Sequence, residues 1–267
     1  MSRLLIFSNV CAFLLVMQSG LLAVNPVKEN VGNLDVYLCI GQSNMAGRAT
    51  LTPELADTLH HVYLLNDQNI FEPAVNPLNR FSTIRKEISM QRLGPSYSFA
   101  KKMAQATVNP IGLVVNARGG SSINSWLKGA DDGYYEEALV RVKAALKYGK
   151  LKAVIWHQGE ADSNNPDKYK VQLISLVSDL RCDLNMPELP FILGQISQWG
   201  EWTKRPEGTK PFNDMLEAVP SFLRHSAVVS SKGLKPYKDE TDPHFDTSSQ
   251  LLLGERYAEA VLRLIKK

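Results

Sequence analysis

Short apolar runs alternate with longer segments of helical periodicity along most of the chain. The runs cover residues 36–40, 62–65, 111–115, 153–156, 191–193 and 227–229. Several are continuous and rich in Val, Ile and Leu, as in strands that are covered on both faces. Helical patterns between them are clearest over residues 95–106, 134–148, 166–182, 213–223 and 247–265. This alternation predicts a three-layer α/β/α sandwich around a mostly parallel sheet.

The first two dozen residues follow a different pattern. Arg3 gives a small positive start, and residues 4–17 are mostly apolar, interrupted only by Ser8 and Asn9. This predicts a secretory signal peptide over residues 1–23 and a single domain over residues 24–267. The run is too short and too interrupted for stable membrane insertion. We therefore expect a secreted or periplasmic protein; the alternative is a buried N-terminal helix.

Composition narrows the class of partner. The 267 residues are 44% hydrophobic and 21% charged, which is typical of a globular protein with one sizeable core. The net charge of +3 comes from scattered basic residues, so we expect no nucleic-acid surface. The chain has no CxxC motif, no paired histidines on a helix, no GxGxxG and no P-loop. We therefore predict no metal and no cofactor.

Polar clusters follow three of the predicted strands. They begin at Ser43, at Asn116 and at His157. Right-handed crossovers place the carboxyl ends of parallel strands at one edge of the sheet, where ligands bind. The three clusters are therefore expected to converge.

Ser43 directly follows a strand and a glycine, Gly41. Such a turn opens a helix whose first N–H groups have no partner within the helix. A serine there can act as a nucleophile, and its own N–H can stabilise an oxyanion. The alternative is a helix N-cap serine. The surrounding residues do not form the GxSxG elbow of α/β-hydrolases, so another serine-hydrolase architecture is required.

His244 is the histidine best placed to be the base for Ser43. It lies just before the last predicted helix, with Asp239, Glu240 and Asp242 close by in the chain. A neighbouring acid can hold the tautomer of a catalytic histidine and stabilise its imidazolium form. The alternative is that His244 is incidental and that the following residues simply cap the helix.

The other two clusters offer further polar groups. Gln158 is an uncharged donor that suits oxyanion stabilisation, and Glu160 could orient its neighbours or bind a sugar hydroxyl. Gly120 belongs to a double glycine that lets the backbone approach a ligand. Trp126 could stack on a sugar or lie in the core.

Five stretches together resemble the SGNH-type hydrolases, and more closely the sialate O-acetylesterase and acetylxylan esterase group, the sixth carbohydrate-esterase family. They occur in the family order and span nearly all of residues 24–267. The stretches are 41–47 (GQSNMAG), 93–95 (LGP), 117–123 (ARGGSSI) with Trp126, 156–160 (WHQGE), and 244–247 (HFDT) with Gly254, Arg256, Tyr257 and Ala258.

The resemblance implies a flavodoxin-like fold and metal-free removal of acetyl groups from carbohydrates such as xylan or sialic acid. Ser43 would be the nucleophile and His244 the base. The oxyanion donors would be the N–H groups of Ser43 and Gly94 and the side chain of Gln158. We expect the substrate to contact Gln42, Asn44, Arg118, Gly120, Trp126 and Glu160.

The chain departs from the family at the acid. The family has Asp three residues before the histidine, where this chain has Thr241. Asp242 is the preferred replacement, Glu240 is a second candidate, and a Ser-His dyad is a third. Two other functions stay open: an SGNH-type esterase of another short-chain acyl ester, and a non-catalytic carbohydrate-binding relative. The sequence indicates no oligomeric state.

Overall fold

The computed structural model describes residues 32–265, so the predicted signal peptide lies outside the described residues. One seven-stranded sheet has the order β3-β2-β4-β1-β5-β6-β7. All of its neighbouring strands are parallel except β2 and β3. The strands are β1 (Leu34–Gly41), β2 (Val62–Leu65), β3 (Phe71–Pro73), β4 (Ile111–Ala117), β5 (Gly149–His157), β6 (Phe191–Gly194) and β7 (Ser226–Val229).

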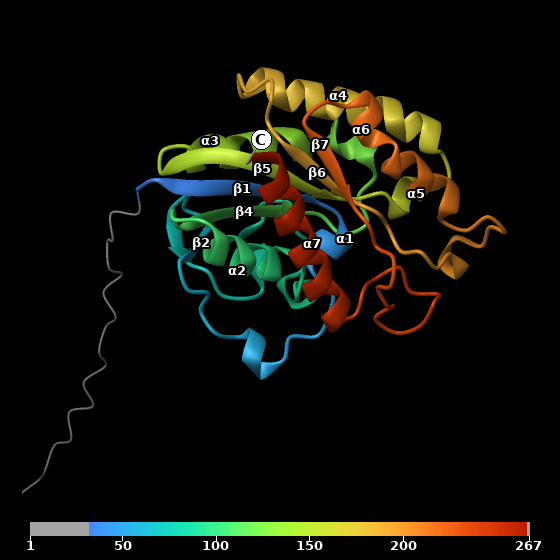
Figure 1. Ribbon diagram of the computed structural model, residues 1–267, viewed down its shortest axis with the longest axis horizontal. Coiled ribbons are helices and arrows are strands. Elements are labelled where there is room, and N and C mark those ends of the chain that lie inside the picture. Colours follow the sequence, from blue (N-terminus) through green and yellow to red (C-terminus); the bar gives the residue numbers. More distant parts are fainter. Residues whose placement is uncertain (1–31, 266–267) are drawn as a thin grey trace, which may run out of the picture. The chain divides into compact units, whose positions relative to one another are not determined.

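Helices cover both faces of this sheet, with α2 and α7 on one face and α3, α4 and α6 on the other (Figure 1). The predicted three-layer α/β/α sandwich is therefore confirmed. The helices are α1 (Ser43–Ala46), α2 (Ser96–Ala106), α3 (Tyr134–Ala145), α4 (Pro166–Asp183), α5 (Lys210–Glu217), α6 (Val219–Phe222) and α7 (Thr247–Ile265).

The central strand β1 is buried along its whole length and divides the core in two. Tyr37 and Cys39 belong to the apolar cluster that includes α2 and α7. Val36 and Leu38 belong to the cluster that includes α3, α4 and α5. Successive strand residues point to opposite faces, so a strand covered on both sides is apolar throughout. This is why β1 is a continuous apolar run in the sequence.

Two features of the sequence prediction need correction. Strand β3 was not predicted, because it has only three residues and lies antiparallel at the sheet edge. The helix expected over residues 213–223 is two helices, α5 and α6. Pro220 stands at the start of α6 and has no N–H with which to continue α5. No helix within residues 32–265 is long and apolar enough to cross a membrane.

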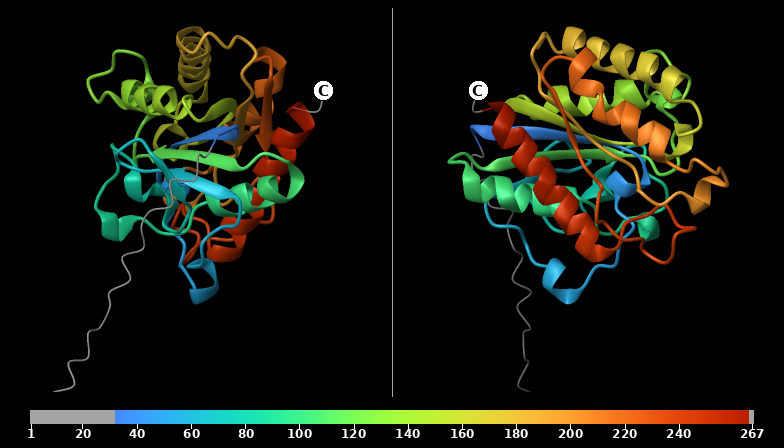
Figure 2. Two further views of the ribbon diagram at one scale, coloured as in Figure 1. Left: turned by 90° about the vertical axis from the view of Figure 1, so that its left-hand side faces the viewer. Right: turned by 45° about the vertical axis from the view of Figure 1, so that its right-hand side comes forward.

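The parallel strands place their carboxyl ends at one edge of the sheet, and α1 begins there. The segment between β7 and α7, residues 230–246, returns to the same edge beside α1 (Figure 2). It carries His244 to Ser43 across 201 positions of sequence. This long return is what completes the candidate site.

Candidate active site

Ser43 stands at a turn that only glycine permits on its strand side. Gly41, the last residue of β1, has φ +135°, and a Cβ there would lie 2.1 Å from the carbonyl oxygen of His157. The missing side chain therefore lets the ends of β1 and β5 approach each other closely. Helix α1 starts two residues later at Ser43, whose exposed fraction is 7%.

The structure brings three of the predicted residues into one chain of contacts. His244 Nε2 lies 2.9 Å from Ser43 Oγ, and His244 Nδ1 lies 2.6 Å from Asp242 Oδ1. With Nδ1–H donating to Asp242, Nε2 is free to accept the serine proton. The same Asp242 oxygen accepts the backbone N–H of His244 at 3.0 Å. This Asx-type turn allows an acid only two residues before the histidine to reach its ring.

Glu240 does not take this place. Its side chain is exposed, and the contacts among residues 32–265 include none between Glu240 and His244. Asp239 is occupied by the backbone N–H and the hydroxyl of Thr241. Trp199 Nε1 donates to the carbonyl oxygen of Asp242 at 2.8 Å and so fixes its backbone.

Burial lowers the pKa of His244, and the nearby cations Arg48 and Lys238 lower it further. Asp242 opposes this shift through its charge and its hydrogen bond. The net direction is downward from the usual value of 6.5, so the imidazole is neutral near pH 7. A neutral imidazole is the form that can accept a proton from Ser43.

A glycine that sequence reasoning did not assign to the oxyanion site, Gly119, lies close to Ser43. A Cβ built on Gly119 would be 2.3 Å from Arg48 Nη2 and 3.6 Å from Ser43 Cβ, so this glycine lies close to both side chains. The backbone N–H groups of Ser43 and Gly119 have no acceptor among the residues that the structure describes. The predicted donor Gly94 packs against Met45 and Gly47, and a Cβ built on it would lie 2.7 Å from the Met45 carbonyl oxygen. Its backbone N–H also has no backbone acceptor among the residues that the structure describes. The double glycine at 119–120 was the signal that pointed to this loop.

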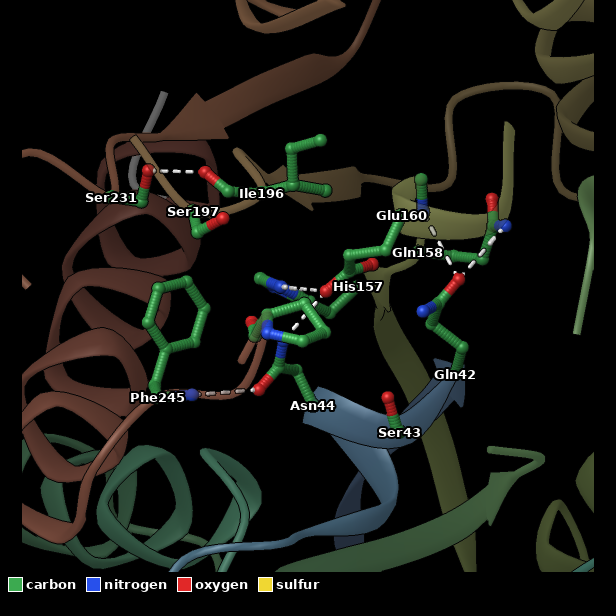
Figure 3. A network of polar contacts seen from close by, with 12 residues as sticks. Gln42, Ser43, Asn44, His157, Gln158, Glu160, Ile196, Ser197, Ser231 and Phe245 are labelled. Atoms are coloured by element: carbon green, nitrogen blue, oxygen red, sulfur yellow. Dashed lines mark hydrogen bonds and ion pairs between the residues drawn. The ribbon is translucent and has the colours of Figure 1, made fainter. Parts of the chain in front are cut away.

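Gln158 is not placed as expected. Its side chain is fully buried, and its amide nitrogen donates to Gln42 Oε1, Ser121 O and Asp162 Oδ2 at 3.1, 3.0 and 2.6 Å. The bond to Gln42 is drawn in Figure 3. An amide with both hydrogens engaged cannot also donate to an oxyanion. The prediction that Gln158 is an oxyanion donor is therefore wrong for this structure.

Trp126 is not a sugar platform either. It is fully buried, and its indole N–H donates to Ser121 Oγ at 2.9 Å. Its ring packs edge-on against Trp156 with a centroid distance of 5.3 Å. A tryptophan gains most from burial when its N–H has a partner, and both conditions are met here. Trp126 is a core residue.

The other expected substrate contacts are mostly structural as well. Gln42, Asn44 and Glu160 are buried. Asn44 Nδ2 donates to Glu160 Oε1, and Gln42 Oε1 accepts the backbone N–H of Gly159. The guanidinium of Arg118 donates to the carbonyl oxygens of Ile84 and Arg85. Gly120 alone is exposed; its φ of +75° suits glycine, and its Cβ position lies 3.6 Å from Lys86 Nζ.

A cleft of about 470 Å³ opens next to His244 and Asp242. This is a common size for a small-molecule site. Its lining contains three cations and one acid, and within residues 32–265 none of the three cations is in an ion pair. The lining residues are Arg48, Ser89, Met90, Arg92, Tyr237, Lys238, Asp242 and His244.

In the described part of the chain, no group of three or more His, Cys, Asp or Glu side chains is arranged to hold a metal ion. At Ser43 a serine hydroxyl, an imidazole and a carboxylate are in hydrogen-bond reach of one another at the edge of a parallel sheet. This is the geometry that serine hydrolases use for nucleophile, base and orienting acid.

Comparison with known proteins places this hydrolase in a family. Residues 33–263 match the family described as carbohydrate esterase, sialic acid-specific acetylesterase, and the chain belongs to it. The match confirms the predicted carbohydrate-esterase resemblance. A probable carbohydrate esterase of Arabidopsis thaliana, At4g34215, is 31% identical over 262 residues, covering 89% of this chain and 92% of that protein.

Solved structures agree at the level of fold. The crystal structure of the Arabidopsis protein has a TM-score of 0.74 at 26% identity, covering 87% of this chain and 99% of that one. NanS has a TM-score of 0.64 at 17% identity, with 88% and 98% covered. A carbohydrate acetylesterase from Xanthomonas citri, XAC1771, has a TM-score of 0.64 at 20% identity, with 86% and 56% covered.

Proposed function

We propose that this protein is a serine O-acetylesterase that removes acetyl groups from carbohydrates through an acetyl-Ser43 intermediate. One observation carries the proposal. Ser43, His244 and Asp242 are joined by contacts of 2.9 and 2.6 Å in a chain that belongs to a carbohydrate esterase family. Family membership supports the substrate class, and the geometry supports the reaction type.

The reaction follows from the position of each group. Ser43 Oγ attacks the acetyl carbonyl carbon while His244 Nε2 takes its proton, and the tetrahedral oxyanion accepts the N–H groups of Ser43 and Gly119. His244 then protonates the departing sugar oxygen, which leaves acetyl-Ser43. Water attacks this ester with His244 again as base, and acetate departs with Ser43 restored. Each well-aimed oxyanion donor contributes about 3–4 kcal/mol in such reactions.

The charge around the cleft favours an acidic sugar, of the sialic acid type, over neutral acetylated xylan. Burial lowers the pKa of Arg48, and the positive charge of Arg92 lowers it further, because the two guanidinium groups repel each other. An anion between them would relieve that repulsion. Lys238 adds a third charge, although it also interacts with the exposed Asp239, so the two arginines support this preference most strongly.

Acetate release from a panel of acetylated sialosides, xylan and pectin tests this function. We expect the acetylated sialic acid to have the highest kcat/KM. Its carboxyl methyl ester should be about tenfold poorer, because one charge-assisted hydrogen bond contributes roughly 1.5–3 kcal/mol. Faster deacetylation of xylan would contradict the acidic substrate while keeping the esterase. Preference for acyl chains longer than butyrate would contradict the acetylesterase.

The apolar leader at residues 4–17 supports a further part of the proposal, that the enzyme works in the periplasm or outside the cell. Expression of the full chain followed by N-terminal sequencing of the exported protein tests it. A mature N-terminus near residue 24 is expected. Retention of the intact chain in the cytoplasm would contradict it.

A further inference from the structure

Asn44, the residue after the nucleophile, holds the backbone on both sides of the base. Its Nδ2 donates to the carbonyl oxygen of Pro243 at 3.1 Å. Its Oδ1 accepts the N–H of Phe245 at 3.2 Å, as drawn in Figure 3. Gln250 Nε2 donates to the same Oδ1 at 3.1 Å. Asn44 is fully buried, so no solvent can replace these bonds. One amide thus joins the Ser43 turn to the segment that carries His244.

Glu160 fixes which way that amide points. Its Oε1 accepts the second hydrogen of Asn44 Nδ2 at 2.6 Å, the shortest contact of the group. A rotation of the Asn44 amide by 180° would set an oxygen against Glu160 and against the Pro243 carbonyl. Both contacts would then be repulsive, so the carboxyl permits only one orientation of the Asn44 amide.

His157, which is also buried, lies near the same oxygen of Glu160 that accepts the Asn44 N–H. Tyr257 donates its hydroxyl to Trp156 O and therefore accepts the Nδ1–H of His157, both at 2.9 Å. His157 Nε2 is then a bare acceptor and has no partner in the described structure, and neither has Glu160 Oε2. His157 Nε2 and Glu160 Oε1 are 3.9 Å apart. Burial lowers the pKa of His157 to about 3, so no ion pair forms between them.

We infer that Asn44 and Glu160 are positioning residues for the esterase reaction: Glu160 orients the Asn44 amide, and Asn44 holds His244 in line with Ser43. Neither residue touches the reacting atoms; both act through the backbone beside His244. The inference rests on the proposed Ser43–His244 chemistry but does not depend on which ester is the natural substrate. A displacement of about 1 Å at a catalytic base can cost about 100-fold in rate.

Four variants test this inference: Asn44→Ala, Asn44→Asp, Glu160→Ala and Glu160→Gln. Turnover of 4-nitrophenyl acetate and the rate of Ser43 labelling by a fluorophosphonate are measured on the folded protein. Asn44→Ala and Asn44→Asp should lower kcat and the labelling rate by about 100-fold with KM changed less than about threefold. Glu160→Ala should lower kcat and the labelling rate nearly as much. Glu160→Gln should stay within about threefold of the wild type, because its amide oxygen still accepts the Asn44 N–H.

Two matched controls separate positioning from folding. Asn213 is a buried asparagine that bonds to the carbonyl oxygens of Ile196 and Ser197, and Glu136 is a carboxylate on α3. Asn213→Ala should lower the Tm while its folded fraction keeps wild-type kcat. Glu136→Ala should also keep wild-type kcat, with a small loss of Tm because Glu136 Oε1 accepts the Gly129 N–H at 2.8 Å. In Asn44→Ala, a looser His244 loop should also move the acid limb of the kcat/KM profile upward, because burial is what lowers the pKa of His244.

Wild-type kcat in folded Asn44→Ala would overturn the inference, and so would an equal loss in Glu160→Gln and Glu160→Ala. A wild-type protein that cleaves 4-nitrophenyl acetate but no acetylated sugar would contradict the proposed substrate class alone. A wild-type protein inert to the fluorophosphonate would overturn both proposals.

Discussion

Two sets of polar residues meet at the same edge of the sheet and differ in how they relate to the cleft beside His244. The open layer consists of Asp242 and His244, which line the cleft with its cations, together with the buried Ser43, whose hydroxyl contacts His244. The buried layer consists of Gln42, Asn44, His157, Gln158 and Glu160, which lie together near Ser43 (Figure 3). Neighbours in the sequence fall into different layers, since Ser43 stands between two buried amides. Position beside a nucleophile therefore does not make a residue a substrate ligand.

The two layers also differ in what a substitution changes. A residue of the open layer can lose its function without leaving a buried polar atom unpaired. In the buried layer each lost partner leaves one, at a cost of about 1–3 kcal/mol. Three buried atoms there, Gln158 Oε1, His157 Nε2 and Glu160 Oε2, already have no partner in the described structure. We expect the open layer to control activity and the buried layer to control stability and alignment.

The largest effect is expected for Ser43→Ala in the open layer. Acetate release should fall by at least about 10⁴-fold, because the nucleophile is removed. The Tm should remain within a few degrees of the wild type. Ser221→Ala, on the exposed side of α6, is the matched control and should be fully active. Turnover by Ser43→Ala at the wild-type rate would refute the serine mechanism.

Asp242→Asn is expected to come next. Loss of the carboxylate removes the group that holds Nδ1–H on His244, and kcat should fall by about 10³–10⁴-fold. Glu240→Gln, two residues away and exposed, should stay within about twofold. Steady-state kinetics on 4-nitrophenyl acetate measures both. Comparable losses in the two variants would contradict the assignment of Asp242 as the acid that orients His244.

Glu160→Gln should change how stability depends on pH. Burial raises the pKa of Glu160 to about 7, with Asp162 adding to the rise and the Asn44 bond opposing it. The unfolded carboxyl titrates near 4.5. The wild-type protein therefore loses folding stability as the pH rises from about 4.5 to about 7, because the folded state must give up a proton that it binds more tightly. The Glu160→Gln variant has no such titration. Its stability relative to the wild type should therefore rise as the pH increases across that window, by on the order of 2–3 kcal/mol.

Urea unfolding at several pH values checks this expectation. The other titratable groups around Glu160 are His157, Asp162, Tyr169 and Tyr257, which both proteins share. A pH-independent difference between the two proteins would show that Glu160 does not titrate in this range.

Gln158→Leu tests whether the buried layer takes part in chemistry. Asp162, Ser121 and Gln42 would each lose the same donor, and we expect about 1–3 kcal/mol of destabilisation. The folded fraction should keep kcat within about fivefold. A 100-fold loss of kcat without loss of stability would restore Gln158 as an oxyanion donor.

Lys238→Gln is expected to have the smallest effect. The positive charge of Lys238 lowers the pKa of His244, so its removal should move the acid limb of kcat/KM upward by a few tenths of a pH unit. The activity rises with pH through this limb because the neutral imidazole is the base. A pH profile at low salt measures the shift. The shift should shrink at 1 M salt, and a salt-independent shift would point to a change of structure instead.

The sequence alone determined the layers of the sheet and singled out Ser43 and His244 as the candidate nucleophile and base. Strands buried on both faces are continuous apolar runs, and α7 begins and ends at the predicted residues. Ser43 and His244 follow from strand-end placement, the acids near His244 and the family resemblance. The sequence did not decide whether Asp242 or Glu240 orients His244, because both lie within reach of the histidine along the chain.

Only the tertiary structure decided which polar residues face the cleft. Burial depends on what packs over a side chain, and the covering residues come from distant segments, as Asn44 and Pro243 show. The same holds for Gly119, whose approach to Ser43 depends on how the loop after β4 folds back. It also holds for the cleft, where Arg48, Arg92 and Lys238 are scattered in the sequence and gathered beside His244 in space.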